Sequence, residues 1–366
     1  MSVRDPRPPT GNRAVHGRGA TIRPAARYES THSEPVDDGW DRDDADAPPV
    51  RTRVTMERAR RVISGNDSPD VPFELSINPY RGCEHGCVYC FARPTHAYMG
   101  LSPGLDFETQ LFAKAGAAAC LREELAAPGY VCRPIALGIN TDAYQPVERR
   151  LRVTRELLEV LHETRHPVTI VTKSSLVERD LDLLVPMAQA GLAQVAVSVT
   201  TLDRELARRM EPRAAAPQRR IETIRRLTDA GVPVSLLVAP LIPVLTDAET
   251  EDLLEAGAGA GAVAAGYVLL RLPGEAAPIF EAWLRTHEPL RAGHVLSRLR
   301  DSHGGRLYDA RFGKRMTGDG PYAQLLRQRF RLARRRAGLA DRMPALDTHR
   351  FTPPGKPSRD GQMDLF

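Results

Sequence analysis

Three cysteines packed into eight residues constrain this chain more than any other feature. Cys83, Cys87 and Cys90 have the spacing C-x3-C-x2-C, directly follow a strand-like run (residues 73–78), and are three of only five cysteines in 366 residues. Thiolates this close on one loop can converge on a metal centre, and iron–sulfur clusters are held by such thiolates. A closed structural site has four protein ligands, whereas no fourth cysteine lies nearby. The spacing therefore predicts a cluster with one open iron, where chemistry can occur.

Two other uses of these cysteines remain open. Disulfides are disfavoured because cysteine is scarce and the chain starts at Met1 without the apolar stretch of a signal peptide, which together predict a reducing, cytoplasmic location. Zinc is the stronger alternative, since His85 or His96 could complete a Cys3His tetrahedron. On that alternative the chain would be a non-enzymatic metal-binding module.

The rest of the central region alternates strand-like and helical segments. Short joins between such segments predict parallel β/α units, which curl into a barrel or an open sheet. In such barrels the reactive residues sit at the carboxyl ends of the strands, which is where the cysteine loop lies. The expected strands are 73–78, 135–140, 168–172, 194–200, 232–238 and 267–272, and the expected helices are 107–126, 152–165, 178–190, 218–230 and 247–256.

The cysteine motif resembles that of the radical S-adenosylmethionine (radical SAM) superfamily, C-x3-C-x-aromatic-C, with Tyr89 in the aromatic place. Residues 69–315 are similar to an uncharacterised bacterial branch of that superfamily related to spore photoproduct lyase. The stretches that carry this similarity are 76–83, 91–96, 102–108 and 171–174. The resemblance implies an α/β fold, a partial six-stranded (β/α)6 TIM-like barrel. It also implies a 4Fe-4S cluster on Cys83, Cys87 and Cys90, and S-adenosylmethionine on its open iron. In that family the reduced cluster cleaves S-adenosylmethionine to a 5′-deoxyadenosyl radical.

Polar residues at the other strand ends are candidates for binding S-adenosylmethionine. A lysine that closes an apolar strand needs a charged partner if it is buried, and Lys173 is such a residue. The resemblance implies that the cofactor contacts are Tyr89, Thr141, Lys173 and Ser198, and that Asp142, Glu211 and Arg213 contact ribose or substrate. Capping or turn roles remain open for these polar residues, because Ser, Thr and Asp are favoured in such places.

One feature of spore photoproduct lyase has no clear counterpart. That enzyme uses a separate cysteine as a hydrogen-atom donor, whereas Cys120 falls in an expected helix and Cys132 just before the second strand, at the far end of the barrel. Both are expected to be ordinary buried thiols. Lyase activity on thymine photoproducts therefore does not follow.

The segment His162–His166 matches the zinc-protease pattern H-E-x-x-H. Because Pro167 follows at once, His166 is expected at or beyond the helix end, which breaks the two-histidine face. No zinc site is expected there.

The two ends of the chain differ from the central region. Residues 1–68 are rich in Pro, Gly, Arg and Asp and predict a disordered or loosely docked tail, within which 17–20 could still dock on the core. Residues 316–350 predict a basic helical extension, in which the helix 322–336 carries six arginines and no acidic residue. Residues 351–366 predict a linker ending in Gln362, Leu365 and Phe366, which resemble the Q-x-x-L-F peptide that docks on the bacterial DNA sliding clamp.

These features leave three classes of function. The favoured one is a radical SAM enzyme that abstracts hydrogen from DNA, in repair, and that takes electrons from a donor such as a flavodoxin or ferredoxin. The second is radical SAM modification of RNA, a protein or a small molecule, and the third is the binding module. A net charge of +5 permits a nucleic-acid partner. The longest apolar run, 256–270, is too short to span a membrane.

Overall fold

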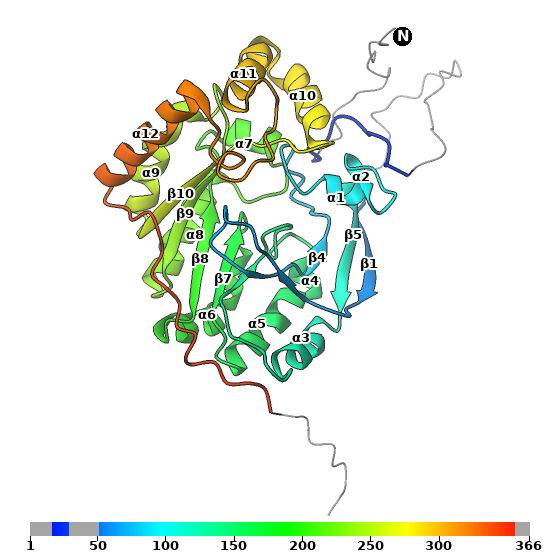
Figure 1. Cartoon of the computed structure of the whole chain (residues 1–366), viewed down its shortest axis with the longest axis vertical. Helices are drawn as coiled ribbons and strands as arrows, with labels where there is room; N and C mark the ends of the chain where they lie inside the picture. Colours follow the sequence, from blue (N-terminus) through cyan, green and yellow to red (C-terminus); the bar gives the residue numbers. More distant parts are fainter. Residues whose placement is uncertain (1–16, 29–50, 356–366) are drawn as a thin grey trace, which may run out of the picture.

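The computed structural model describes residues 17–28 and 51–355. Its main element is a seven-stranded sheet in the order β10-β9-β8-β7-β6-β3-β2 (Figure 1). Neighbouring strands from β3 to β10 pair in parallel, and β2 pairs with β3 in antiparallel fashion. The strands are β2 (Ile63–Gly65), β3 (Leu75–Ile77), β6 (Ile135–Leu137), β7 (Val168–Thr172), β8 (Ala193–Ser198), β9 (Val234–Leu241) and β10 (Ala264–Leu269). The six parallel strands are the six expected ones, and their sequential order is that of a partial (β/α)6 barrel.

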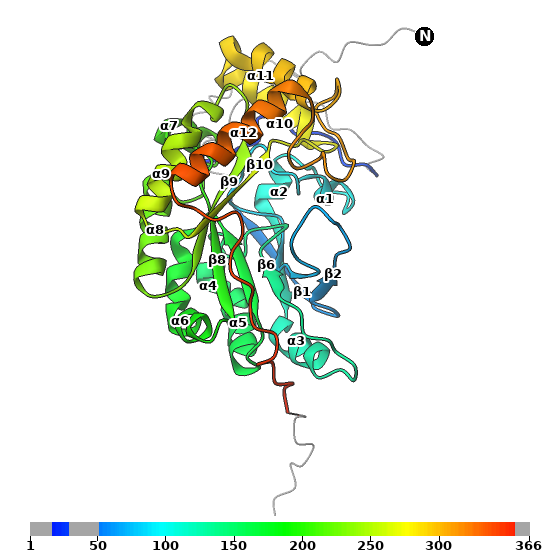
Figure 2. The same cartoon turned by 60° about the vertical axis from the view of Figure 1, so that its left-hand side comes forward.

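Helices connect these strands and cover the outer face of the sheet, as Figure 2 shows for α6, α8 and α9. Helix α5 illustrates why the sequence folds this way: its apolar residues recur with helical spacing, so one face is buried and the other is charged. The connecting helices are α5 (Val153–Glu163), α6 (Leu181–Gln189), α7 (Arg204–Met210), α8 (Pro217–Asp229) and α9 (Thr250–Gly259), with 3-10 turns at Ser175–Asp180 and Asp247–Glu249. Helix α5 ends before His166, which is buried and bonded to Tyr130. The H-E-x-x-H segment thus has no two-histidine face.

A second, three-stranded sheet lies beside the barrel opening. It has the order β1-β5-β4, with β1 (Arg53–Arg58), β4 (Tyr80–Arg81) and β5 (Gln110–Ala115). Strand β5 falls inside the expected helix 107–126, which was therefore wrong over those residues. The segment is a strand because it pairs with β1 and β4, which are distant in sequence. The helices around it are α1 (Pro94–Ala97), α2 (Leu105–Thr109), α3 (Ala117–Leu125) and α4 (Glu148–Leu151).

The prediction of a tail over 1–68 was wrong for its last part, residues 51–68. Strands β1 and β2 lie within it, and β2 extends the main sheet, so the ordered core begins well before residue 69. Residues 17–28 also pack on the protein: Gly19 and Ala20 are buried against the cysteine loop. The acidic run 34–46 lies outside the described residues.

Three C-terminal helices pack on the barrel, the first two of them next to the cysteine loop. They are α10 (Ala276–His287), α11 (Pro289–Ser302) and α12 (Gly320–Arg336), and Figures 1 and 2 show α12 beside α9 and α11. Helix α12 buries Leu326 and Phe330 in the main core, so the basic extension is part of the barrel wall. Phe351 likewise packs on His166, with ring centroids 5.2 Å apart, so the first residues of the expected linker contact the core. Within the described ranges, no helix is both long enough and apolar enough to cross a membrane.

Candidate active site at the open end of the barrel

The cysteine loop begins where β4 ends, on the edge of the barrel formed by the strand carboxyl ends. Cys83 and Cys87 are buried and Cys90 is partly buried. Two glycines with left-handed backbone angles, Gly82 (φ 75°) and Gly86 (φ 67°), let the chain turn between them. The Cys83 amide donates to the carbonyl oxygen of Phe107 at 2.9 Å, which ties the loop to α2.

The surroundings of the three thiols fit a cluster better than a single zinc ion. Burial raises the pKa of each thiol, so a thiolate here needs the positive charge of a metal centre. Among the residues that the structure describes, no group of three His, Cys, Asp or Glu side chains is arranged to hold a single metal ion. The histidines of the zinc alternative have other partners: His85 Nδ1 lies 3.4 Å from Asp142 Oδ2, and His96 Nε2 lies 2.9 Å from the Gln110 carbonyl oxygen.

A fully buried ion pair supports the loop from behind. Arg93 Nη2 lies 2.6 Å from Glu108 Oε1, and both side chains are fully buried. The same guanidinium donates to the carbonyl oxygens of Cys87 (3.0 Å), Gly86 (3.1 Å), Pro103 (3.1 Å) and Gly104 (2.9 Å). Arg93 therefore uses its planar, multiply donating group to fix the path of the loop.

The N-terminal segment completes this support. The amides of Gly19 and Ala20 donate to the two oxygens of Glu108 at 3.0 and 2.9 Å. A Cβ on Gly19 would lie only 1.9 Å from the carbonyl oxygen of Gly86, so only glycine permits this approach. Residues 17–28 are thus held directly against the cysteine loop.

Lys173, at the end of β7, is the centre of a polar cluster beside the cysteines. Its Nζ donates to Ser198 Oγ (2.8 Å), Thr200 Oγ1 (3.0 Å) and the Ala239 carbonyl oxygen (2.9 Å). It also lies 3.1 Å from Glu211 Oε1. Lys173 and Ser198 were both predicted, and the structure brings them together across β7, β8 and β9.

Glu211 joins this cluster to the cysteine motif. Its carboxylate accepts a hydrogen bond from the Tyr89 hydroxyl and pairs with the buried Arg220. Burial opposes its ionisation, but Arg220 and then Lys173 hold the pKa of Glu211 below its usual range, so it is charged. Burial, and then the charge of Glu211, raises the pKa of Tyr89, so the phenol stays neutral and acts as a donor. Tyr89, Lys173, Ser198 and Glu211 thus form one connected cluster.

The other predicted residues lie around this cluster. Asp142 accepts from the Lys173 amide at 2.7 Å and pairs with His85 in the cysteine loop, which links two strand ends. Thr141 Oγ1 donates to the Tyr80 carbonyl oxygen at 2.8 Å, a structural bond below the loop. Arg213 lies apart, with Nη2 at 3.2 Å from Glu84 Oε1.

Three members of the site were missed from the sequence. Thr200 follows Ser198 at the strand spacing of two, a signal that was available. Arg220 lies on α8, where a charged residue normally faces solvent, and nothing local marks it as the partner of Glu211. Arg271, just beyond β10, stacks over the ring of Phe91 at 4.1 Å, next to Cys90.

The two remaining cysteines lie away from this site. Cys120 is on α3, with Sγ 3.8 Å from Glu124 Oε1. Cys132 precedes β6, at the amino end of the parallel strands and so opposite the cysteine loop. Burial raises the pKa of Cys132 to about 11, so it is a protonated thiol at neutral pH.

Comparison with known proteins agrees with this geometry. A sequence model of the Radical SAM superfamily matches residues 77–257. Uncharacterized protein Rv2578c of Mycobacterium tuberculosis is 40% identical over 233 residues, which cover 63% of this chain and 67% of that protein. The chain belongs to the radical SAM superfamily. It is therefore an enzyme, and the cofactors of its family are a 4Fe-4S cluster and S-adenosylmethionine.

More distant likenesses extend the comparison. Uncharacterized protein MJ0683 of Methanocaldococcus jannaschii is 26% identical, covering 54% of this chain and 71% of that protein. Among solved structures, a spore photoproduct lyase variant superposes with a TM-score of 0.58 at 17% identity, covering 78% of this chain and 80% of the other. A second such structure, holding a dinucleoside spore photoproduct, gives a TM-score of 0.56 at 16% identity, with coverage of 78% and 80%. At these identities the likeness concerns the fold alone, and the barrel is that of radical SAM proteins.

Proposed function

We propose that this radical SAM enzyme abstracts hydrogen from DNA in a repair reaction. The observation that carries the chemistry is the connected cluster of Tyr89, Glu211, Lys173 and Ser198 directly beside the three cysteines. When bound, the cluster and S-adenosylmethionine together supply an oxidising 5′-deoxyadenosyl radical. The residues of this chain bind and orient those groups and shelter them from water.

Each residue has a distinct part in this proposal. Cys83, Cys87 and Cys90 hold the cluster. Lys173 and Ser198 would hold the methionine carboxylate, because an ammonium and a hydroxyl group at neighbouring strand ends can both donate to a carboxylate. Glu211 balances the charge of Lys173 and Arg220 and fixes the Tyr89 ring, which would pack on the adenosine side of a bound S-adenosylmethionine.

Three of the other predicted residues have supporting parts. Asp142 and Thr141 hold the loop and the strand ends in register through the bonds described above. Arg213 lies on the outer side of the loop with Glu84, where it is placed for substrate rather than for the cofactor.

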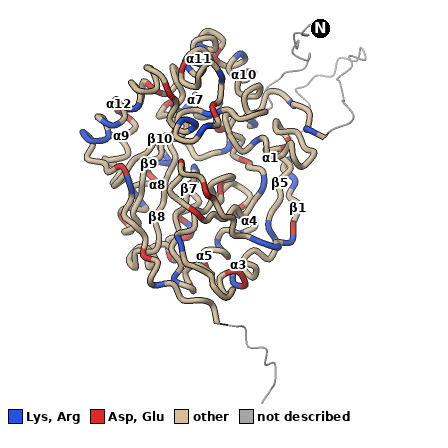
Figure 3. Tube along the Cα trace, viewed as in Figure 1, with Lys and Arg blue, Asp and Glu red and all other residues tan. Residues whose placement is uncertain are grey.

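The DNA substrate is inferred from charge. The chain carries a net charge of +5, and Lys and Arg positions gather along α12 (Figure 3). Arg329 is engaged with Glu251, whereas Arg331, Arg335 and Arg336 are exposed. An exposed row of guanidinium groups neutralises backbone phosphates. Arg329 is therefore not available to bind phosphates, whereas Arg331, Arg335 and Arg336 are.

The other partners follow from the same proposal. The reaction needs an external electron donor, for which a flavodoxin or ferredoxin is suited, and such a pair operates in the cytoplasm. Gln362, Leu365 and Phe366 lie outside the described residues. We propose that they dock the enzyme on the DNA sliding clamp, which would deliver it to newly copied DNA.

The substrate proposal is tested with the reconstituted, reduced enzyme and deuterium-labelled oligonucleotides. UV-irradiated duplex DNA should stimulate formation of 5′-deoxyadenosine and should pass deuterium into it. Undamaged DNA, RNA of the same sequence and a peptide mixture are the controls. If RNA or peptide stimulates the reaction and irradiated DNA does not, the DNA substrate is wrong.

Two sets of variants test DNA binding by α12 and docking on the sliding clamp separately. Replacing Arg331, Arg335 and Arg336 with Ala should weaken DNA binding and lower its salt dependence, whereas replacing the exposed Arg285 on α10 should not. Deleting Phe366 should abolish capture by immobilised sliding clamp and leave DNA binding unchanged. Equal capture of both forms would refute clamp docking.

A further inference from the structure

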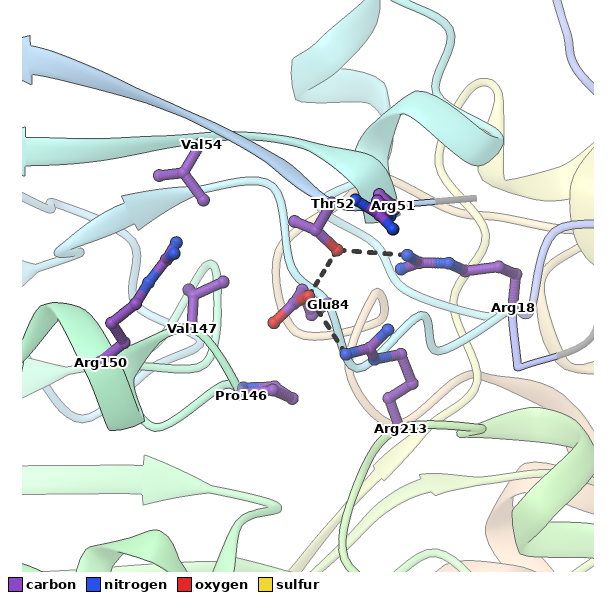
Figure 4. Close-up of a pocket in the computed structure, with 9 residues that line it drawn as sticks. All are labelled: Arg18, Arg51, Thr52, Val54, Glu84, Pro146, Val147, Arg150 and Arg213. Carbon is purple, nitrogen blue, oxygen red and sulfur yellow. Dashed lines mark hydrogen bonds and ion pairs between the residues drawn. The ribbon is translucent and has the colours of Figure 1, made fainter. Parts of the chain in front are cut away.

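A basic cavity opens on the outer side of the cysteine loop (Figure 4). Its volume is about 450 Å³, which is enough for a phosphate group and the sugar attached to it. Four guanidinium groups and one carboxylate contribute to its wall. The polar residues that line it are Arg18, Arg51, Thr52, Glu84, Arg150 and Arg213.

These residues come from segments that are far apart in sequence and meet at the reactive edge of the barrel. Glu84 lies within the cysteine loop itself, directly after Cys83. Arg213 lies between β8 and α8, and Arg150 on α4, which follows β6. The N-terminal segment contributes Arg18, and Arg51 directly precedes β1. The cavity therefore exists only because residues 17–28 and the small sheet close over the loop.

Glu84 is the only acidic side chain among the residues that line this cavity. It accepts a hydrogen bond from Thr52 Oγ1 at 2.5 Å and pairs with Arg213 at 3.2 Å. Arg18 Nη2 in turn donates to Thr52 Oγ1 at 3.2 Å. Burial, and then the nearby charge of Arg213, lowers the pKa of Arg18, while Glu108 and Glu84 oppose the shift.

Two of the arginines that line the cavity make no ion pair within the described residues. Arg51 and Arg150 are exposed at the rim, and the described part of the chain provides neither with an ion pair. In Figure 4 Arg150 lies on the side of Glu84 opposite Arg18 and Arg213, whereas Arg51 lies beside Thr52, on the side of Arg18. Glu84 pairs with Arg213, so Arg51 and Arg150 leave the cavity with guanidinium donors suited to an anion with several oxygens.

We propose that this cavity binds a phosphate group of the substrate. Guanidinium groups match the oxygens of phosphate in pairs, and their charge persists at any physiological pH. The inference rests on the proposed function, because a nucleic-acid backbone is one source of that phosphate. Glu84 also belongs to the cysteine loop, which Gln145 bridges. The Glu84 amide donates to Gln145 Oε1 at 2.8 Å, and Gln145 Nε2 donates to the Gly82 carbonyl oxygen at 3.1 Å. An anion that draws Arg213 from Glu84 therefore acts on the loop that carries Cys83.

The test measures binding of a fluorescent single-stranded oligonucleotide to the reconstituted enzyme over a range of salt. The double variant Arg51→Ala/Arg150→Ala is compared with Arg53→Ala/Arg149→Ala, which removes the same charge from exposed neighbours outside the cavity. The cavity variant should bind about tenfold more weakly, and the slope of log K against log salt should fall by about 0.7 for the one phosphate lost. The matched control should keep most of the affinity and most of the salt dependence.

A second arm distinguishes the source of the phosphate. Inorganic phosphate and pyrophosphate are titrated against thermal unfolding, with chloride at equal ionic strength as control. Stabilisation by pyrophosphate that the cavity variant loses, without a loss of oligonucleotide binding, would assign the cavity to a free phosphate ester. If the cavity variant and the matched control behave alike in both arms, the proposal is refuted. Neither arm requires turnover, so a failure to find a DNA product would not affect the result.

Discussion

The buried carboxylate of Glu211 should stabilise the protein strongly at neutral pH. The substitution Glu211→Gln keeps the shape of the side chain but removes the charge that faces Arg220, whose side chain is 1% exposed, and Lys173, which is 14% exposed. Removing one partner of a buried pair costs about 3–5 kcal/mol, because the remaining charge loses its compensation in a dry environment. We expect the free energy of unfolding at pH 7 to fall by about that amount.

The direction in which the stabilising effect of Glu211 changes with pH can also be predicted. The folded-state pKa of Glu211 is depressed below its ordinary value of 4.5. Its stabilising effect is therefore present above pH 4.5 and is lost as pH falls through the lower, folded-state pKa. The difference between wild type and Glu211→Gln should be constant from pH 7 to 5 and should shrink below that.

Urea denaturation at several pH values measures this difference. The matched control is Glu222→Gln, which breaks an exposed pair with Arg226 on α8 and should change stability little. A loss of under about 1 kcal/mol for Glu211→Gln at pH 7, or a difference that does not shrink in acid, would refute the argument that Glu211 is an ionised, buried counter-charge.

Three further predictions concern the loop and the core. Arg93→Lys cannot make the five hydrogen bonds that hold the loop, so reconstituted protein should contain less iron and lose its visible absorbance faster; unchanged iron content would contradict this role. Burial lowers the pKa of His166 to about 4 from 6.5. The free energy of unfolding of wild type should therefore fall as pH falls from 6.5 to 4, whereas that of His166→Asn should not. Parallel stability curves for the two proteins would contradict this role of His166. Gly19→Ala forces a Cβ against the carbonyl oxygen of Gly86, so residues 17–28 should become sensitive to trypsin, and equal digestion rates would show that the segment is not held there.

Much of the barrel could be predicted because its signals are local. Each parallel strand is an apolar run with a helix after it, and all six were placed within a few residues. Strand β5 could not be predicted, because residues 110–115 are a strand only through pairing with β1 and β4. For the same reason β1 was assigned to the tail: its residues are mostly exposed and carry little of the apolar signal that marks a strand.

The same difference between local signals and long-range packing applies to the residues of the site. Lys173 and Ser198 stand at strand ends, and topology alone places strand ends together, so their contact was predictable. Arg220 was not, because it belongs to a helix and reaches the site only through the packing of α8 against the sheet. Thr141 and Arg213 show the converse: both lie next to the cysteine loop, but the partner of each side chain depends on the path of that loop and could not be read from the sequence.

The central claim is that Cys83, Cys87 and Cys90 hold the cluster at which S-adenosylmethionine is cleaved. The most direct measurement is the amount of 5′-deoxyadenosine, by mass spectrometry, from anaerobically reconstituted and reduced protein. Wild type and Cys132→Ala should both form it, because Cys132 lies at the other end of the strands, and Cys87→Ala should form none. Product from Cys87→Ala, or none from iron-loaded wild type, would contradict the account.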